Sequence, residues 1–298
     1  MKYRNPYFEN TDEDPEYEAN KVLAQIEWDG TVPIDLLDIC EQYGLECIFR
    51  ADPSMSEPGK TAFRNEVDFY IQINTYNTDC LDGFSHNQTT LRRQRFTLAH
   101  EIAHCIFRSH INLKLQQNLS NKNNPHSKFY PKIREDQANQ FAAYLLIPRK
   151  AFEQFSRQVG WHNIAQLIQQ TSEKFDVSLE VAAQQIARLA DYPCIAILFD
   201  RNGNPKKVPA YSADFQETKL FYSRNQSAPS GTAIAKMLSN LNQNLNQNQQ
   251  TKKHFSDASI WFPEAPDWRA EKFSVVETSL QTGKYGILTF LEICKIDN

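Results

Sequence analysis

Features that would place a protein in a membrane or outside the cell are missing from this sequence. No run of about 18 consecutive apolar residues is present, so a membrane-spanning helix is not expected. The first ten residues, MKYRNPYFEN, contain neither an apolar core nor a small-residue cleavage site, and no signal peptide is expected there. The six cysteines include no CxxC pair and are expected to be reduced thiols. These absences favour a cytoplasmic globular protein that makes no contact with a membrane.

The sequence also lacks an excess of positive charge. It has 32 Lys and Arg against 36 Asp and Glu, which gives a formal net charge of −4. Binding to nucleic acid usually depends on a basic surface, so direct nucleic-acid binding is not expected. Hydrophobic residues make up 41% of the 298 residues and charged residues 23%. This composition excludes a wholly disordered chain and allows one large domain or two ordinary ones.

The chain is expected to consist of an arm and two domains. The acidic, proline-containing start predicts a flexible arm over residues 1–17. From residue 18 to residue 190 the apolar pattern is mainly helical with a few short strands, whereas residues 191–298 are rich in strand-like runs. We therefore predict an α+β protein with a domain boundary near residue 191, in which a mainly helical domain precedes a smaller mixed α+β domain.

Individual elements follow from periodicity and turn residues. In the first domain we predict helices at 17–28, 34–43, 89–108 and 133–146, and strands at 45–50, 60–65 and 68–74. In the second we predict a helix at 231–241 and strands at 194–199, 205–222, 257–262, 272–281 and 284–295. The last two strands flank a Gly-Lys turn and form an expected hairpin. The Asn- and Gln-rich stretch 239–253 is expected to be a loop.

One motif carries a specific chemistry. The segment RFTLAHEIAHCIF contains His100, Glu101 and His104 in the order H-E-x-x-H, inside a strongly helical pattern. Four residues advance a helix by about 400°, so both imidazoles leave the same face one turn apart. This spacing lets two histidine nitrogens bind one Zn²⁺ at about 2.0–2.1 Å. Glu101 follows the first ligand directly and can act as the general base toward a metal-bound water.

A catalytic zinc normally has three protein ligands and a water, so a third ligand is needed. His110 lies six residues after His104, as in the pattern H-E-x-x-H-x-x-G-x-x-H. Phe107 stands where that pattern has the glycine that turns the chain back. On a continued helix, His110 would point roughly 80–120° away from the other two ligands. His110 is therefore an unfavoured candidate.

The next predicted helix offers two carboxylates. Glu135 opens this helix, and Asn139 follows one turn later on the same face, where it can orient a ligand histidine. Asp136 would point about 100° away from that face. Glu135 is the better placed of these candidates, while an acidic residue at a helix start is also explained by the helix dipole.

Two blocks of sequence resemble one known family. RFTLAHEIAH and EDQANQFAAYLLIP, the second running from Glu135 to Pro148, are similar to the ImmA/IrrE family of metallopeptidases. The resemblance covers about residues 18–190 and implies a zincin-like fold. It also implies a zinc site formed by His100, His104 and Glu135, with Glu101 as general base.

The resemblance further implies a regulatory function. Proteins of this family cleave a helix-turn-helix repressor or a similar transcription factor, often in mobile-element or stress control. Two positions depart from the family pattern. Ala103 replaces a glycine that is common before the second histidine, and Arg108 stands where many members carry another histidine. Residues 191–298 resemble the sensor-like, GAF-type domains attached to some members.

Other interpretations of the site stay open at this point. A non-proteolytic regulatory protein could keep the zinc and act through partner or DNA binding. An intact Glu101 favours the enzyme, because a structural zinc needs no general base. A zinc hydrolase of small molecules is discouraged, since no motif for a small ligand is present. His126 and Tyr130 are both candidates to stabilise an oxyanion. Four arginines could line a cleft for an acidic or polypeptide partner, but a solvated helix face is the favoured interpretation: Arg92, Arg93, Arg95 and Arg108.

Overall fold

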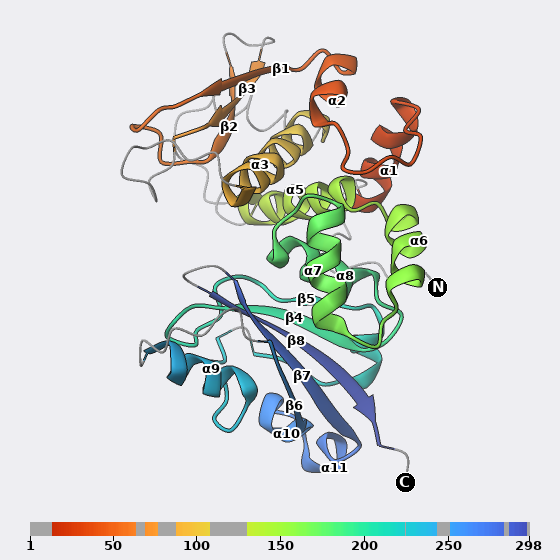
Figure 1. Ribbon diagram of the computed structural model, residues 1–298, viewed down its shortest axis with the longest axis vertical. Helices are drawn as coiled ribbons and strands as arrows, with labels where there is room; N and C mark the ends of the chain where they lie inside the picture. Colours follow the sequence, from red (N-terminus) through yellow and green to blue (C-terminus); the bar gives the residue numbers. More distant parts are fainter. Residues whose placement is uncertain are drawn as a thin grey trace. The chain divides into compact units, whose positions relative to one another are not determined.

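The structure is a computed structural model that describes residues 14–63, 69–76, 88–107, 130–223, 225–242, 251–282 and 286–296. Within these ranges the chain has a mixed α+β fold with two small sheets, which confirms the predicted class (Figure 1). It divides into two compact units. The first comprises Met1–Glu153 and Lys174–Ser178, and the second comprises Gln154–Glu173 and Leu179–Asn298. None of the helices in the described ranges has the length and apolar character needed to cross a bilayer.

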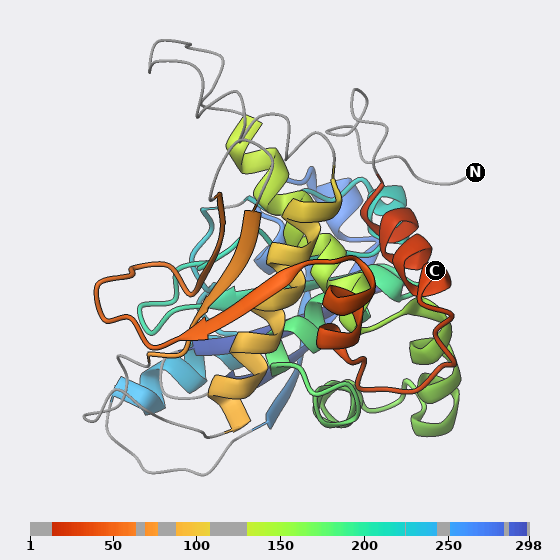
Figure 2. The same cartoon turned by 90° about the horizontal axis from the view of Figure 1, so that it is seen from above.

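The small sheet of the first unit has three strands. They are β1 (Glu46–Arg50), β2 (Gly59–Phe63) and β3 (Phe69–Asn74), in the order β1-β3-β2. β3 is parallel to β1 and antiparallel to β2, so β2 forms one edge of this sheet. Ile71 and Ile73 of the central strand are fully buried. Helix α3 (Gln88–Ile106) packs against β2 and β3 (Figure 2).

Helix α3 is also covered on its other side. It packs against α5 (Tyr130–Leu146), which in turn contacts α1 (Pro15–Gln25), while α2 (Leu36–Gln42) contacts both α3 and β1. Both α3 and α5 bury alanines completely, at Ala99, Ala103, Ala138 and Ala142. Small side chains let two helix backbones approach closely, so α3 and α5 can place side chains within ligand distance of each other.

Two arginines near the start of α3 are engaged within the first unit. Arg92 Nε lies 3.0 Å from Asp176 Oδ1, and Arg95 Nε lies 3.5 Å from Asp176 Oδ2. Arg95 also donates from Nη2 to the carbonyl of Ile34 at 3.1 Å. The expectation of a solvated helix face is therefore wrong for these two residues, because their guanidinium groups pair with a carboxylate and a carbonyl.

The second unit is built on a five-stranded sheet that follows helices α7 (Ile164–Lys174) and α8 (Leu179–Leu189); α6 (Arg149–Val159) precedes them. The strands are β4 (Cys194–Phe199), β5 (Ala210–Tyr211), β6 (Thr251–Asp257), β7 (Phe273–Thr282) and β8 (Gly286–Lys295). Their order is β5-β4-β8-β7-β6, and every neighbouring pair is antiparallel. The pairing of β7 with β8 confirms the predicted hairpin.

Two predicted strands of this unit are wrong. In 205–222 only Ala210–Tyr211 pairs as a strand, and Asp214–Thr218 forms a 3₁₀ helix, η3. The segment 257–262 contains a helix, α10 (Ala258–Trp261), and β6, which precedes it, begins inside the stretch 239–253 that was predicted as a loop. The reason for the second error is the spacing of the buried residues. Ala258, Trp261 and Phe262 are all fully buried, a three- and four-residue spacing that favours a helix over a strand.

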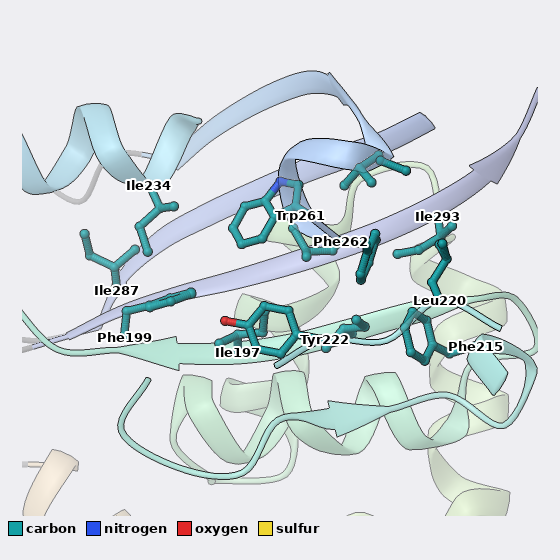
Figure 3. Packing of buried hydrophobic residues seen from close by; sticks show 14 of the residues in the cluster. Ile197, Phe199, Phe215, Leu220, Tyr222, Ile234, Trp261, Phe262, Ile287 and Ile293 are labelled. Atoms are coloured by element: carbon teal, nitrogen blue, oxygen red, sulfur yellow. The ribbon is translucent and has the colours of Figure 1, made fainter. Parts of the chain in front are cut away.

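Side chains from both helices and strands form the core of the second unit (Figure 3). Ile195, Ile197 and Phe199 alternate along β4 and face Ile234 of α9 (Ala233–Asn242) and Trp261 of α10. The sheet is covered on both faces, because α8 packs against β4, β5 and β8, while α9, α10 and α11 (Asp267–Ala270) pack against β7.

A buried carboxylate joins α9 to the sheet. Glu277 of β7 is fully buried, and its two oxygens accept hydrogen bonds from the backbone N–H groups of Ala233 and Ile234 at 2.8 and 2.7 Å. Ser279 Oγ donates to the same carboxylate at 2.8 Å. The first N–H groups of a helix have no partner inside the helix and favour a negative charge. Glu277 therefore caps α9 from a neighbouring strand.

Candidate metal centre

Helix α3 presents two imidazoles that converge on one point. His100 and His104 lie one turn apart, and their Nε2 atoms are 3.1 Å from each other. The ring centroids are 4.7 Å apart with an interplanar angle of 80°. His104 is buried and His100 is mostly buried. Two imidazole nitrogens that face each other need either a proton or a cation between them. Because the surroundings are apolar, a bound proton or cation is favoured over water at this position.

Helix α5 adds a carboxylate to the same point. Glu135 Oε2 lies 3.1 Å from His100 Nε2, and Glu135 Oε1 lies 3.4 Å from His104 Nε2. Ligand atoms bound at 2.0–2.1 Å to a tetrahedral Zn²⁺ lie about 3.3 Å from one another. The two nitrogens are close to that separation, and each of them has a different Glu135 oxygen at a similar distance. One ligand atom of each residue lies within 4.8 Å of the others, and two nitrogens with a carboxylate oxygen are the donor set of a three-ligand zinc site. These residues therefore fit the metal that the sequence motif implies.

The charge of Glu135 also fits a bound cation. Hydrogen bonds from His100, and then from His104, hold the pKa of the Glu135 carboxyl well below its usual range. Glu135 is therefore ionised at neutral pH, as a metal ligand must be.

A fourth side chain orients the first histidine. Asn139 lies one turn after Glu135 on α5, and its Oδ1 is 3.1 Å from His100 Nδ1. An amide oxygen can only accept a hydrogen bond, so Nδ1 carries the proton and donates it. Because Nδ1 keeps its proton, a bound metal would take the place of the hydrogen on Nε2, the atom that faces His104 and Glu135.

Glu101 directly follows His100 on α3 and is not a member of this group. Its side chain is buried, and its Oε2 accepts a hydrogen bond from Thr61 Oγ1 of β2 at 2.8 Å. The group of three possible ligands, whose atoms all lie within 4.8 Å of one another, does not include Glu101. A carboxylate next to a metal position that is not itself a ligand is available as a base.

The two helices are held together just beyond the histidines. Phe107 directly follows the end of α3 and is fully buried. Its ring makes an edge-to-face contact with Phe141 of α5, with a centroid distance of 5.5 Å and an angle of 71°. Phe107 N also donates to the carbonyl of Ala103 at 2.9 Å. The residue at the position of the missing glycine therefore anchors α3 to α5.

Some sequence candidates cannot be placed. His110, His126 and Arg108 lie outside the described residues, and so does the side chain of Tyr130, which begins α5. Asp136 lies on α5 but is not one of the three grouped ligands. Its neighbour Glu135 fills that position.

Thr61 was not among the residues predicted for the site. This residue lies 40 positions before Glu101, on a strand whose pairing could not be read from local pattern. The predicted strand 60–65 placed it on a strand, but nothing local indicated that this strand faces the motif helix.

Comparisons with known proteins found a matching family model and a solved structure of similar fold. Residues 84–187 match the family model described as the IrrE N-terminal-like domain, Peptidase_M78, and this confirms the ImmA/IrrE resemblance. A solved structure described as a "Mycobacterium tuberculosis transcriptional regulator" is similar in fold, with a TM-score of 0.58 and 13% sequence identity. The match covers 95% of this chain and 76% of that one. No curated protein sequence matches the chain.

Proposed function

We propose that the protein is a zinc-dependent endopeptidase, because residues 84–187 match the family model of the IrrE N-terminal-like domain (Peptidase_M78). The metal ligands are His100, His104 and Glu135. One observation carries the proposal: two histidine nitrogens from α3 and a carboxylate oxygen from α5 converge, with the nitrogens 3.1 Å apart and one ligand atom of each residue within 4.8 Å of the others.

Each residue around the proposed metal position has a separate role. A zinc ion bound there supplies Lewis acidity to a water nucleophile and to a peptide carbonyl. The carboxylate of Glu101 accepts the proton of the attacking water and then passes it to the leaving amine. Asn139 keeps His100 in the tautomer that binds through Nε2. Glu135 brings a negative charge to the metal position.

The substrate we propose is a protein regulator, a helix-turn-helix transcriptional repressor, cleaved in a mobile-element or stress response. The support is the ImmA/IrrE resemblance of the two motif blocks. The similar solved structure is that of a transcriptional regulator, which is compatible with a regulatory function. Binding of an extended segment of the substrate would hold the scissile carbonyl against the metal position.

A Glu101→Gln variant tests this proposal. It should bind one zinc per chain, retain substrate and fail to cleave it, because an amide cannot take up the proton. Proteins retained by this variant are purified and incubated with the zinc-loaded wild type. Cleavage by the wild type and none by Glu101→Gln is expected. Equal cleavage by both, or no cleavage of any retained protein, would refute the proposal.

A second function is a non-proteolytic regulatory protein that uses the same zinc site. The observation in its favour is the similar solved structure, which is described as a regulator and not as a peptidase. The Glu101→Gln experiment described above distinguishes the two functions. A regulator of this kind would retain its partner equally in the wild type and in Glu101→Gln, and leave it intact.

For residues 191–298 we propose a sensor or substrate-selection domain of GAF-like type. The support is a five-stranded sheet with helices on both faces and a single core. A chain ending at residue 190 tests the boundary. It should bind zinc but show altered regulation, whereas an insoluble or metal-free product would contradict the boundary. A chain ending at residue 190 keeps α8 but loses the strands β4 and β5 that cover it. A chain ending at residue 178 lacks α8 altogether and is therefore the matched control for the effect of this uncovered helix face.

A further inference from the structure

The strand β2 makes a specific contact with the proposed general base. Thr61 Oγ1 donates to Glu101 Oε2 at 2.8 Å and lies 3.8 Å from Cys105 Sγ. Glu101 is buried on this side of α3. A buried carboxylate without a donor is costly, so this hydroxyl both stabilises the carboxylate and fixes its rotamer.

The backbone of β2 is also close to Glu101. A Cβ atom added at Gly59 would lie 2.4 Å from Thr97 Cγ2 and 3.4 Å from Glu101 Cγ. The absence of a side chain at Gly59 is therefore what lets the start of β2 lie against α3. Thr61, two residues later on the same face of the strand, reaches Glu101 because of this approach.

We propose that Thr61 is a positioning residue that orients Glu101 for proton transfer, an inference that rests on the proposed peptidase function. With Oε2 held by Thr61, Oε1 is the oxygen left to accept the proton from the attacking water. A freely rotating carboxylate would spend only part of its time in that orientation.

Thr61→Val and Thr61→Ser test the role. Valine keeps the β-branched shape and removes the hydroxyl, while serine keeps the hydroxyl. We expect Thr61→Val to lower kcat on the order of 10–100-fold, as for other residues that orient a catalytic group. KM and zinc content should stay unchanged, and Thr61→Ser should recover most of kcat. A wild-type kcat in Thr61→Val, or a loss that serine does not recover, would overturn the proposal.

Crystal structures of the zinc-loaded wild type and both variants give a readout that needs no substrate. The Glu101 carboxylate should keep one orientation in the wild type and Thr61→Ser, and lose it in Thr61→Val. An unchanged carboxylate in Thr61→Val would overturn the role of Thr61. If the wild type cleaves no substrate, the peptidase function fails, and these structures still decide the role of Thr61.

A second inference rests on a different pair of residues. Cys40 of α2 and Cys47 of β1 have their Sγ atoms 3.2 Å apart. Cys40 is buried and Cys47 is partly exposed, and neither forms a disulfide. The hydrogen bond with Cys40 lowers the pKa of the Cys47 thiol, while the same contact and burial raise the pKa of Cys40. Cys47 is therefore the more reactive of the two thiols.

We infer that Cys40 and Cys47 form a reversible disulfide when the protein meets a peroxide. The Cys47 thiolate attacks hydrogen peroxide, which gives a sulfenic acid and hydroxide. The Cys40 thiol then attacks the sulfenic sulfur, forms the S–S bond and releases water. Overall, two thiols are oxidised and one peroxide is reduced to two waters. A dithiol reductant reverses the modification by exchange.

Peptide mapping of the full chain tests this inference. Treatment with one equivalent of hydrogen peroxide should yield a peptide that joins Cys40 to Cys47, and the intact mass should fall by two hydrogens. Cys47→Ser should prevent both changes, whereas Cys294→Ser, at an exposed cysteine, should not. Cys47 oxidised beyond the sulfenic acid while Cys40 stays reduced, or a disulfide between other cysteines, would overturn the inference.

Discussion

Removing the carboxylate of Glu135 should weaken zinc binding far more than removing the amide of Asn139. Glu135 is one of the three proposed ligands, and its two oxygens lie 3.1 and 3.4 Å from the histidine nitrogens. Zinc sites in small peptides are worth on the order of 10 kcal/mol or more. Loss of one ligand in three therefore costs roughly 3 kcal/mol, a reduction in affinity of about 100-fold or more.

The expected loss for Asn139→Ala is smaller. Asn139 makes one hydrogen bond with His100 Nδ1, at a position that is not fully buried, so water can replace the amide. Asn139→Ala should therefore lower the zinc affinity by about 10-fold, near the low end of the range for residues that orient a metal ligand. The two variants are thus expected to differ by about one order of magnitude.

Affinity is measured by competition with a chromophoric chelator at fixed pH, with circular dichroism as the check that each variant is folded. His110→Ala is the control, because His110 is the alternative ligand. Wild-type affinity in Glu135→Ala together with a large loss in His110→Ala would refute the assignment. It would move the site to the H-E-x-x-H-x-x-G-x-x-H geometry.

Three further predictions concern stability. Glu277→Ala should destabilise the second unit by about 2–4 kcal/mol in urea denaturation, because two helix N–H groups lose their acceptor, whereas the exposed Glu271→Ala should have little effect. Phe107→Ala should lower the free energy of unfolding by about 3–5 kcal/mol and weaken zinc binding, because α3 loses its contact with α5. Leu91→Ala, at an exposed residue, is the control, and an equal effect of both substitutions would contradict the role of Phe107. The lowered pKa of Glu135 implies stability that is present above the ordinary glutamate value of 4.5 and lost as the pH falls below it toward the lowered pKa. Metal-free wild type should therefore exceed Glu135→Gln in stability at pH 7 and lose that advantage in acid; a difference that does not change with pH would contradict this.

The grouping of the proposed metal ligands was largely predictable, because much of its geometry is local. His100 and His104 converge through helix periodicity alone, and Glu135 and Asn139 share a face for the same reason. What the sequence did not contain is the contact between α3 and α5. The structure provides it through buried alanines on both helices and the Phe107–Phe141 contact.

The remaining features depend on tertiary contacts. Thr61 reaches Glu101 only because β2 pairs with β3 and packs on α3, which no local pattern shows. The helix α10 was predicted as a strand because a short apolar run favours both states, and burial of Trp261 and Phe262 on one side decides between them. The residues 205–222 were also predicted as a strand, although in the structure Ala210–Tyr211 forms a two-residue strand and Pro205 pairs with β4 through an isolated bridge.

Zinc titration of the metal-free chain, with bound zinc and cleavage of a retained repressor recorded on the same samples, tests the central claim most directly. The account predicts that cleavage rises in proportion to bound zinc and stops rising at one zinc per chain. Glu101→Gln should bind the same amount of zinc without cleavage. Cleavage by the metal-free chain, or cleavage by zinc-loaded Glu101→Gln at the wild-type rate, would contradict it.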